Sequence, residues 1–238
     1  MVCNATRFNL KMLYTSKETA MPVILPGETD LYALTDSRLS LGRPLEEVVR
    51  ALLGAGVRII QYREKKKKGG EMLEECRLMR RLCDEYGACF IVDDHVDLAM
   101  ICHADGIHIG QEDIPLPEVR ALVGPGMCLG LSTHSPEQAR EAVRLGADYI
   151  GVGPIFATQT KEDVVAPVGF AYLDWVAANL SLPFVAIGGI KEHNISEVAR
   201  HGARCCALVS ELVGAPDIAA KVTAVREAMR AGRNGDSQ

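Results

Sequence analysis

Eight short apolar runs, spaced roughly 20 to 35 residues apart, constrain the fold of this chain more than any other feature. Most are apolar on both faces and rich in Val and Ile, which is typical of buried parallel strands. We therefore predict eight strands, at residues 31–35, 57–61, 89–93, 106–109, 127–131, 149–152, 184–187 and 205–209.

Amphipathic helical patterns separate most of these runs. One of them begins with a serine cap at Ser135 and a proline at the favoured first helical position, Pro136. We predict helices at residues 45–53, 71–86, 136–145, 171–179, 195–201 and 216–230, and a weaker one at 116–123. Alternating strands and helices of this number predict an α/β protein with a single (β/α)8 TIM barrel.

The alternative to the barrel is a doubly wound open sheet. Such a sheet usually has fewer strands and a glycine-rich first strand–helix turn, whereas residues 35–40 contain no G-x-G-x-x-G pattern. The barrel is therefore favoured, as one catalytic domain over residues 29–230. We expect residues 1–28 to form an N-terminal extension and residues 231–238 a flexible C-terminal tail.

Charge and composition exclude several classes of protein. The net charge of −5 argues against a nucleic-acid partner, and no apolar run approaches the roughly 18 residues of a membrane span. The first 30 residues lack the pattern of a secretory signal. The eight cysteines are scattered without a C-x-x-C pair, so we expect reduced, mostly buried thiols and a cytoplasmic protein.

The second predicted strand ends in the charged run QYREK at residues 61–65. Alternate residues of a strand share one face, so Gln61, Arg63 and Lys65 should point the same way. Two cations and an amide in that arrangement suit a multiply charged anion such as a diphosphate. The alternative is an exposed edge strand with solvated charges.

Other polar residues follow the remaining strands, at the end of a barrel where active sites assemble. Asp94 and Asp113 follow the neighbouring third and fourth strands, and paired carboxylates suit Mg²⁺ bridged to phosphate oxygens. Either aspartate could instead cap the helix that follows. His108 alternates with two isoleucines, which favours an internal hydrogen-bonding role over metal binding.

Three further strand ends suit a phosphate group. Gly188 and Gly189 allow close approach of backbone amides, and Val209 and Ser210 follow the eighth strand, where many barrels bind phosphate. The sixth loop adds the hydroxyls and the cation of Thr158, Thr160 and Lys161. Together these segments predict one site with room for two phosphorylated groups.

With these motifs in place, the chain resembles the thiamin phosphate synthase family from about residue 31 to residue 226. The shared motifs are QYREK at 61–65, ADGIHIGQED at 104–113, LSTH at 131–134, ADYIGVGPIFATQTK at 147–161 and VAIGGI at 185–190. The resemblance implies a (β/α)8 barrel transferase. Such an enzyme joins hydroxymethylpyrimidine diphosphate to a thiazole phosphate that carries a carboxylate, and it releases pyrophosphate.

The resemblance also implies roles for individual residues. Arg63, Lys65 and Lys161 would be catalytic, and Asp94 and Asp113 would bind the Mg²⁺ cofactor. The substrate-binding residues would be Gln61, Tyr62, Arg63, Glu64, Lys65, Asp93, Ser132, Thr158, Thr160, Lys161, Gly188, Gly189, Val209 and Ser210. The partners would be small-molecule substrates, and whether the chain forms a homo-oligomer is left open.

One position departs from the family pattern. The family usually has Asn immediately before the metal-binding Asp, where this chain has Asp93. An extra negative charge beside a diphosphate should weaken binding unless Asp93 is protonated or turned away, and it could instead help to hold the metal.

Three other functions are also considered from the sequence. A thiazole tautomerase-like relative would not need QYREK together with paired metal carboxylates. An isomerase of amino-acid biosynthesis would need a facing general acid and base, and we find no convincing pair. A non-catalytic ligand sensor on the same barrel can be excluded only by turnover.

Overall fold

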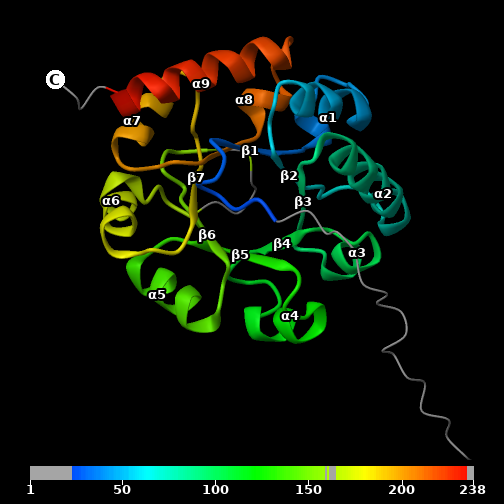
Figure 1. The fold of residues 1–238 in the computed structure, drawn as a ribbon, viewed down its shortest axis with the longest axis horizontal. Helices are drawn as coiled ribbons and strands as arrows, with labels where there is room; N and C mark the ends of the chain where they lie inside the picture. Colours follow the sequence, from blue (N-terminus) through cyan, green and yellow to red (C-terminus); the bar gives the residue numbers. More distant parts are fainter. Residues whose placement is uncertain (1–22, 159, 161–164, 235–238) are drawn as a thin grey trace, which may run out of the picture.

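The structure of the protein, a computed structural model, describes residues 23–158, 160 and 165–234. Eight parallel strands form a closed barrel in the order β1 to β8, and the helices form a ring around it (Figure 1). The strands are β1 (Leu31–Leu34), β2 (Ile59–Tyr62), β3 (Cys89–Asp93), β4 (Gly106–Ile109), β5 (Cys128–Thr133), β6 (Tyr149–Val152), β7 (Phe184–Ile187) and β8 (Cys206–Leu208). The predicted barrel is therefore confirmed, and strand ends differ from prediction by at most two residues.

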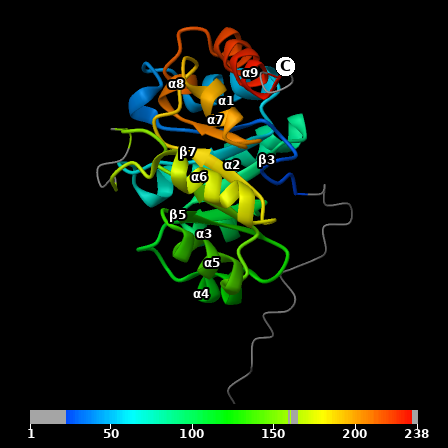
Figure 2. The ribbon, with the colours of Figure 1, turned by 90° about the vertical axis from the view of Figure 1, so that its left-hand side faces the viewer.

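The helices cover the outside of the barrel, and Figure 2 views it from the side that α6 covers. They are α1 (Leu45–Gly54), α2 (Gly69–Tyr86), α3 (Val96–Ile101), α4 (Leu116–Val123), α5 (Pro136–Leu145), α6 (Gly169–Asn179), α7 (Ile195–Arg200), α8 (Ser210–Val213) and α9 (Ile218–Asn234), with a 3-10 turn η2 at Ser37–Leu39. None of the helices in this described part of the chain is long and apolar enough to cross a membrane.

The structure differs from prediction at three places. Helices α3 and α8 were not predicted, because six and four residues are too few to establish a helical period. Helix α9 continues to Asn234, so residues 231–234 belong to the barrel rather than to a flexible tail. The remaining tail, residues 235–238, lies outside the described residues, as do residues 1–22 of the predicted extension.

Each strand divides its side chains between two apolar cores, as the two-residue period requires. On β1, Leu31 and Ala33 belong to the core between strands and helices, while Tyr32 and Leu34 belong to the core inside the barrel. Residues 23–25 pack against the inner core just before β1 and supply apolar cover to it. The inside of the barrel is therefore filled by side chains, and a ligand must bind at the carboxyl ends of the strands.

Candidate active site

Arg63 is the most deeply placed cation of the strand ends, with 4% of its surface exposed. It follows β2, and its guanidinium donates a hydrogen bond of 3.1 Å to Asp36 Oδ2, just beyond β1. Its Nε lies 3.6 Å from Asp93 Oδ2 at the end of β3. Neither Arg63 Nε nor Asp93 Oδ2 has a hydrogen-bond partner among the described residues. Each atom can therefore still form a hydrogen bond.

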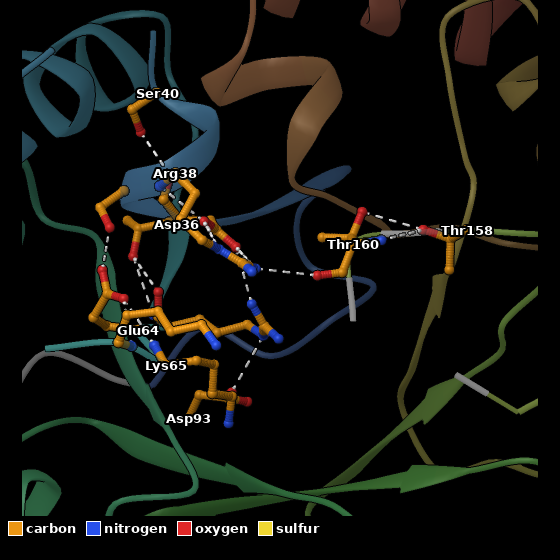
Figure 3. Close-up of polar contacts among 12 residues, drawn as sticks. Asp36, Arg38, Ser40, Glu64, Lys65, Asp93, Thr158 and Thr160 are labelled. Carbon is orange, nitrogen blue, oxygen red and sulfur yellow. Dashed lines mark hydrogen bonds and ion pairs between the residues drawn. The ribbon is translucent and has the colours of Figure 1, made fainter. Parts of the chain in front are cut away.

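Lys65 extends from the same strand end toward the acidic end of β3. Its Nζ lies 3.4 Å from Asp93 Oδ2 and contacts the carboxylate of Asp94 (Figure 3 shows Lys65 and Asp93). Burial lowers the pKa of Lys65, but the carboxylates of Asp93 and Asp94 outweigh it, so the pKa lies above its ordinary value. Lys65 is therefore a cation at neutral pH.

Asp93 is neither solvated nor turned away from the cations. It is 5% exposed and lies between Arg63 and Lys65. The extra negative charge at this position therefore lies against two cations, which also pair with Asp36 and Asp94.

Asp94 and Asp113 meet at the ends of β3 and β4, as predicted from their places in the chain. Asp94 adopts a left-handed backbone conformation with φ of 59°, and Asp113 accepts a hydrogen bond of 2.6 Å from the Gly110 amide. Burial raises the pKa of Asp113, and its contact with Asp94 raises it further, against the Gly110 amide and Lys65, which lower it. Two carboxylates in contact repel each other unless a proton or a cation lies between them, so this pair suits a divalent cation.

Gln61 and Ser132 line the floor of the site inside the barrel. Gln61 is 2% exposed and donates a hydrogen bond of 2.9 Å to the hydroxyl of Tyr32. Ser132 Oγ lies 3.0 Å from His108 Nε2, and His108 Nδ1 lies 3.0 Å from the hydroxyl of Tyr149. His108 therefore has the internal hydrogen-bonding role that its place in the sequence predicted.

The ends of β7 and β8 come together at the opposite side of the opening. Gly188 and Gly189 have positive φ, and a Cβ at Gly189 would lie 2.6 Å from the carbonyl oxygen of Ala157. The loop after β6 thus packs directly on these glycines. Ser210 begins α8 and accepts a hydrogen bond of 2.7 Å from Lys191 Nζ.

The loop after β6 also reaches Arg38, which lies beyond the end of β1 (Figure 3). Thr158 Oγ1 donates a hydrogen bond of 3.1 Å to Thr160 Oγ1, and Arg38 donates one of 3.5 Å to the carbonyl oxygen of Thr160. Lys161, predicted to be catalytic, lies outside the described residues.

The structure does not bring Tyr62 and Glu64 into this cluster. Tyr62 faces the helix layer, where its hydroxyl donates a hydrogen bond of 2.7 Å to Glu75 of α2. Glu64 accepts hydrogen bonds from Ser37 and from the Lys65 amide, so it orders the loop after β2. Tyr62 is on β2 and therefore points to the other side of the strand from Gln61, whereas Glu64 lies in the loop beyond the end of the strand.

Sequence reasoning missed Asp36, Arg38 and Lys191. Asp36 is 3% exposed and accepts hydrogen bonds from Arg38 and Arg63 (Figure 3). It lies two residues beyond β1, so the rule that identified the other strand ends would have found it. Lys191 lies two residues after the Gly188-Gly189 turn, and no pattern in the neighbouring sequence indicates its contact with Ser210.

Barrel geometry with cations and carboxylates gathered at the carboxyl ends of the strands defines a (β/α)8-barrel enzyme. The chain matches the family model described as thiamine monophosphate synthase over residues 31–212. It belongs to the thiamine-phosphate synthase family and is therefore a transferase of thiamine biosynthesis.

Individual relatives agree with this assignment. Thiamine-phosphate synthase of Lawsonia intracellularis is 56% identical over 212 residues, which cover 88% of this chain and 98% of that protein. The enzyme of the same name from Pelotomaculum thermopropionicum is 58% identical over 199 residues, covering 84% and 91%. The solved structure of thiamine phosphate pyrophosphorylase from Pyrococcus furiosus superposes with a TM-score of 0.78 at 36% identity, covering 85% of this chain and 96% of that one.

Proposed function

We propose that this enzyme couples hydroxymethylpyrimidine diphosphate to a thiazole phosphate, with or without a carboxylate on the thiazole, and releases pyrophosphate. The observation that carries the proposal is a cluster at three adjoining strand ends, where Arg63 faces Asp93 and Lys65 contacts Asp94, which in turn meets Asp113. This combination of cations and paired carboxylates matches the chemistry of a metal-bound diphosphate.

The diphosphate would displace part of the internal ion pairing. Lys65 contacts Asp94 in the structure, and an incoming diphosphate would compete for its ammonium group. That exchange would release the Asp94 carboxylate for a metal ion. Arg63, held by Asp36 and facing Asp93, would keep its position while its remaining donors bind phosphate oxygens.

Asp94 and Asp113 would hold Mg²⁺, since their contact fits a cation and both offer hard oxygen ligands. No group of three or more His, Cys, Asp or Glu side chains suited to a metal occurs among residues 23–158, 160 and 165–234. Phosphate oxygens and water would therefore complete the shell, as is usual for Mg²⁺. When bound, the ion supplies positive charge that neutralises the diphosphate.

Bond cleavage would be dissociative. The bond from the pyrimidine methylene carbon to the diphosphate oxygen breaks, and the electron pair leaves with pyrophosphate. Arg63, Lys65 and Lys161 would stabilise the departing charge, while the pyrimidine amino group stabilises the methylene cation. The thiazole nitrogen then forms the new bond to carbon. That nitrogen carries no proton, so no general base is required.

The thiazole phosphate would bind at the far side of the opening, at Gly188, Gly189, Val209 and Ser210 together with Thr158 and Thr160. Its support is the loop after β6, which packs on the two glycines and reaches Arg38 on the diphosphate side. Lys191, bonded to Ser210, would add a cation there. The seven described cysteines are free, which supports a cytoplasmic enzyme.

Two substitutions test the proposal. Arg63→Ala and Asp113→Ala should each lower kcat by about 10²- to 10³-fold, because each removes a charge that acts on the leaving group or its metal. Arg144→Ala and Asp174→Ala, on exposed helix surfaces, are the matched controls and should keep full activity. A fully active, folded Asp113→Ala enzyme would exclude the metal assignment.

A further inference from the structure

A chain of hydrogen bonds crosses the interior of the barrel beneath the site. Gln61 Nε2 donates to the Tyr32 hydroxyl at 2.9 Å, and the Tyr32 and Tyr149 hydroxyls lie 3.0 Å apart. Tyr149 in turn lies 3.0 Å from His108 Nδ1, and His108 Nε2 lies 3.0 Å from Ser132 Oγ. The two ends of this chain, Gln61 and Ser132, are both residues of the predicted substrate site.

The two tyrosines in the middle of the chain are sealed from any ligand. Tyr32 is 2% exposed and Tyr149 is 1% exposed, within the inner core. Burial raises the pKa of each phenol well above its ordinary value, so each keeps its single O–H proton. Each phenol has one proton and two neighbours in the chain, and only if Tyr32 accepts from Gln61 and donates to Tyr149 do both O–H groups have an acceptor in the chain.

This constraint gives the whole chain one direction. Gln61 donates to Tyr32, so Tyr32 donates to Tyr149, and Tyr149 donates to His108 Nδ1. His108 then carries its proton on Nε2 and donates to Ser132. At one end the Ser132 proton is left to donate outward. At the other, Gln61 Oε1 is a buried acceptor that no group in the described part of the chain satisfies.

The link between Tyr149 and His108 depends on a missing side chain on β5. A Cβ at Gly130 would lie 2.2 Å from Tyr149 Cζ and 2.4 Å from His108 Nδ1. Any larger residue at Gly130 would therefore push the two rings out of their places. The glycine at position 130 therefore leaves the space in which this hydrogen bond forms.

We propose that Tyr149 is a positioning residue that fixes Gln61 as an acceptor and Ser132 as a donor toward the substrate. Gln61 Oε1 then accepts from the exocyclic amino group of the pyrimidine, and Ser132 donates to the diphosphate. The chain thereby couples recognition of the amino group to the placement of the leaving group. This inference rests on the proposed function, since it needs an aminopyrimidine diphosphate as the substrate.

Tyr149→Phe tests the inference because it removes one hydroxyl and leaves the ring in place. The assay compares kcat/KM for hydroxymethylpyrimidine diphosphate and for the analogue with hydrogen in place of the amino group. Wild type should prefer the amino substrate. In Tyr149→Phe, kcat/KM should fall roughly 10- to 100-fold for the amino substrate and much less for the analogue, because Gln61 is no longer held as an acceptor.

Tyr172→Phe is the matched control. Tyr172 is also buried, at 5% exposure, and its hydroxyl donates a hydrogen bond of 2.7 Å to Thr133, outside the chain. It should keep the preference for the amino group. Thermal unfolding of both variants separates loss of stability from loss of recognition.

Tyr32→Phe adds a readout that a purely structural role would not move. It breaks the adjacent link, so the double variant with Tyr149→Phe should lose no more preference than either single variant. The inference would be overturned if the double variant lost the sum of the two single losses in preference for the amino substrate. It would also be overturned if the preference of Tyr149→Phe lay within twofold of that of Tyr172→Phe. In both cases the proposed function would stand. Absence of product from the folded wild type would overturn the proposed function and, with it, this inference.

Discussion

Removal of the Asp36 carboxylate should destabilise the barrel strongly. Asp36 accepts hydrogen bonds from the backbone and guanidinium of Arg38 and from Arg63, and both Asp36 and Arg63 are 4% exposed at the side chain. Asp36→Ala would leave the Arg63 guanidinium buried, with Asp93 as its remaining ion-pair partner among the described residues. A buried cation that loses a partner cannot recover its lost hydration.

Breaking a buried ion pair from one side costs about 3–5 kcal/mol. For a domain of this size that corresponds to a fall in Tm of roughly 6–20 °C. Urea unfolding followed by circular dichroism measures the free energy directly. Asp36→Asn keeps one acceptor oxygen and should lose less.

Glu141→Ala is the control, since Glu141 pairs with Arg144 on the exposed face of α5. Its free energy of unfolding should match the wild type, because exposed ion pairs contribute little. A loss below about 1 kcal/mol for Asp36→Ala would refute the view that Asp36 holds Arg63 against its desolvation cost.

Three further results are expected. Burial raises the pKa of Glu211, but hydrogen bonds from the Glu192 amide and Lys191 outweigh burial, so the net pKa is lowered. Glu211→Gln should therefore lower the free energy of unfolding near pH 7, and this loss should fade as the pH falls below about 4.3. A loss that does not depend on pH would contradict this. Burial raises the pKa of the described thiols, to about 12 for Cys206, so a thiol reagent should modify them only after unfolding; rapid modification of the native enzyme would contradict it. Arg226→Lys should lower the free energy of unfolding in urea by about 1.5–3 kcal/mol, because the Arg226 guanidinium donates hydrogen bonds to Asp30 and to the carbonyls of residues 55 and 56. An unchanged urea midpoint would show that these hydrogen bonds do not hold α9 to the barrel.

The fold could be predicted because its signal repeats. Every strand is short and mostly apolar, and the barrel closes where eight such runs alternate with helices. Helices α3 and α8 could not be predicted, since a helix of one or two turns is fixed by packing rather than by its own period.

The site could be predicted in part for the same reason. Strand alternation placed Gln61, Arg63 and Lys65 on one side, and the structure brings Arg63 and Lys65 to Asp93. The same alternation, applied to the whole motif, would have separated Tyr62 from them.

The contacts beneath the site could not be predicted. Tyr32 and Tyr149 are 117 residues apart, and their hydroxyls meet only because β1 and β6 both turn these side chains into the barrel. Each tyrosine alone resembles an ordinary core aromatic. A hydrogen bond across the barrel depends on the closure of the sheet, which no local pattern contains.

The most direct measurement incubates the purified enzyme with both phosphorylated substrates, with and without Mg²⁺, and quantifies thiamin phosphate and pyrophosphate together. The proposed coupling predicts both products in equal amounts, dependent on the metal and lost in Asp113→Ala. Pyrophosphate without thiamin phosphate, or no product from a folded enzyme that still binds the diphosphate, would contradict it.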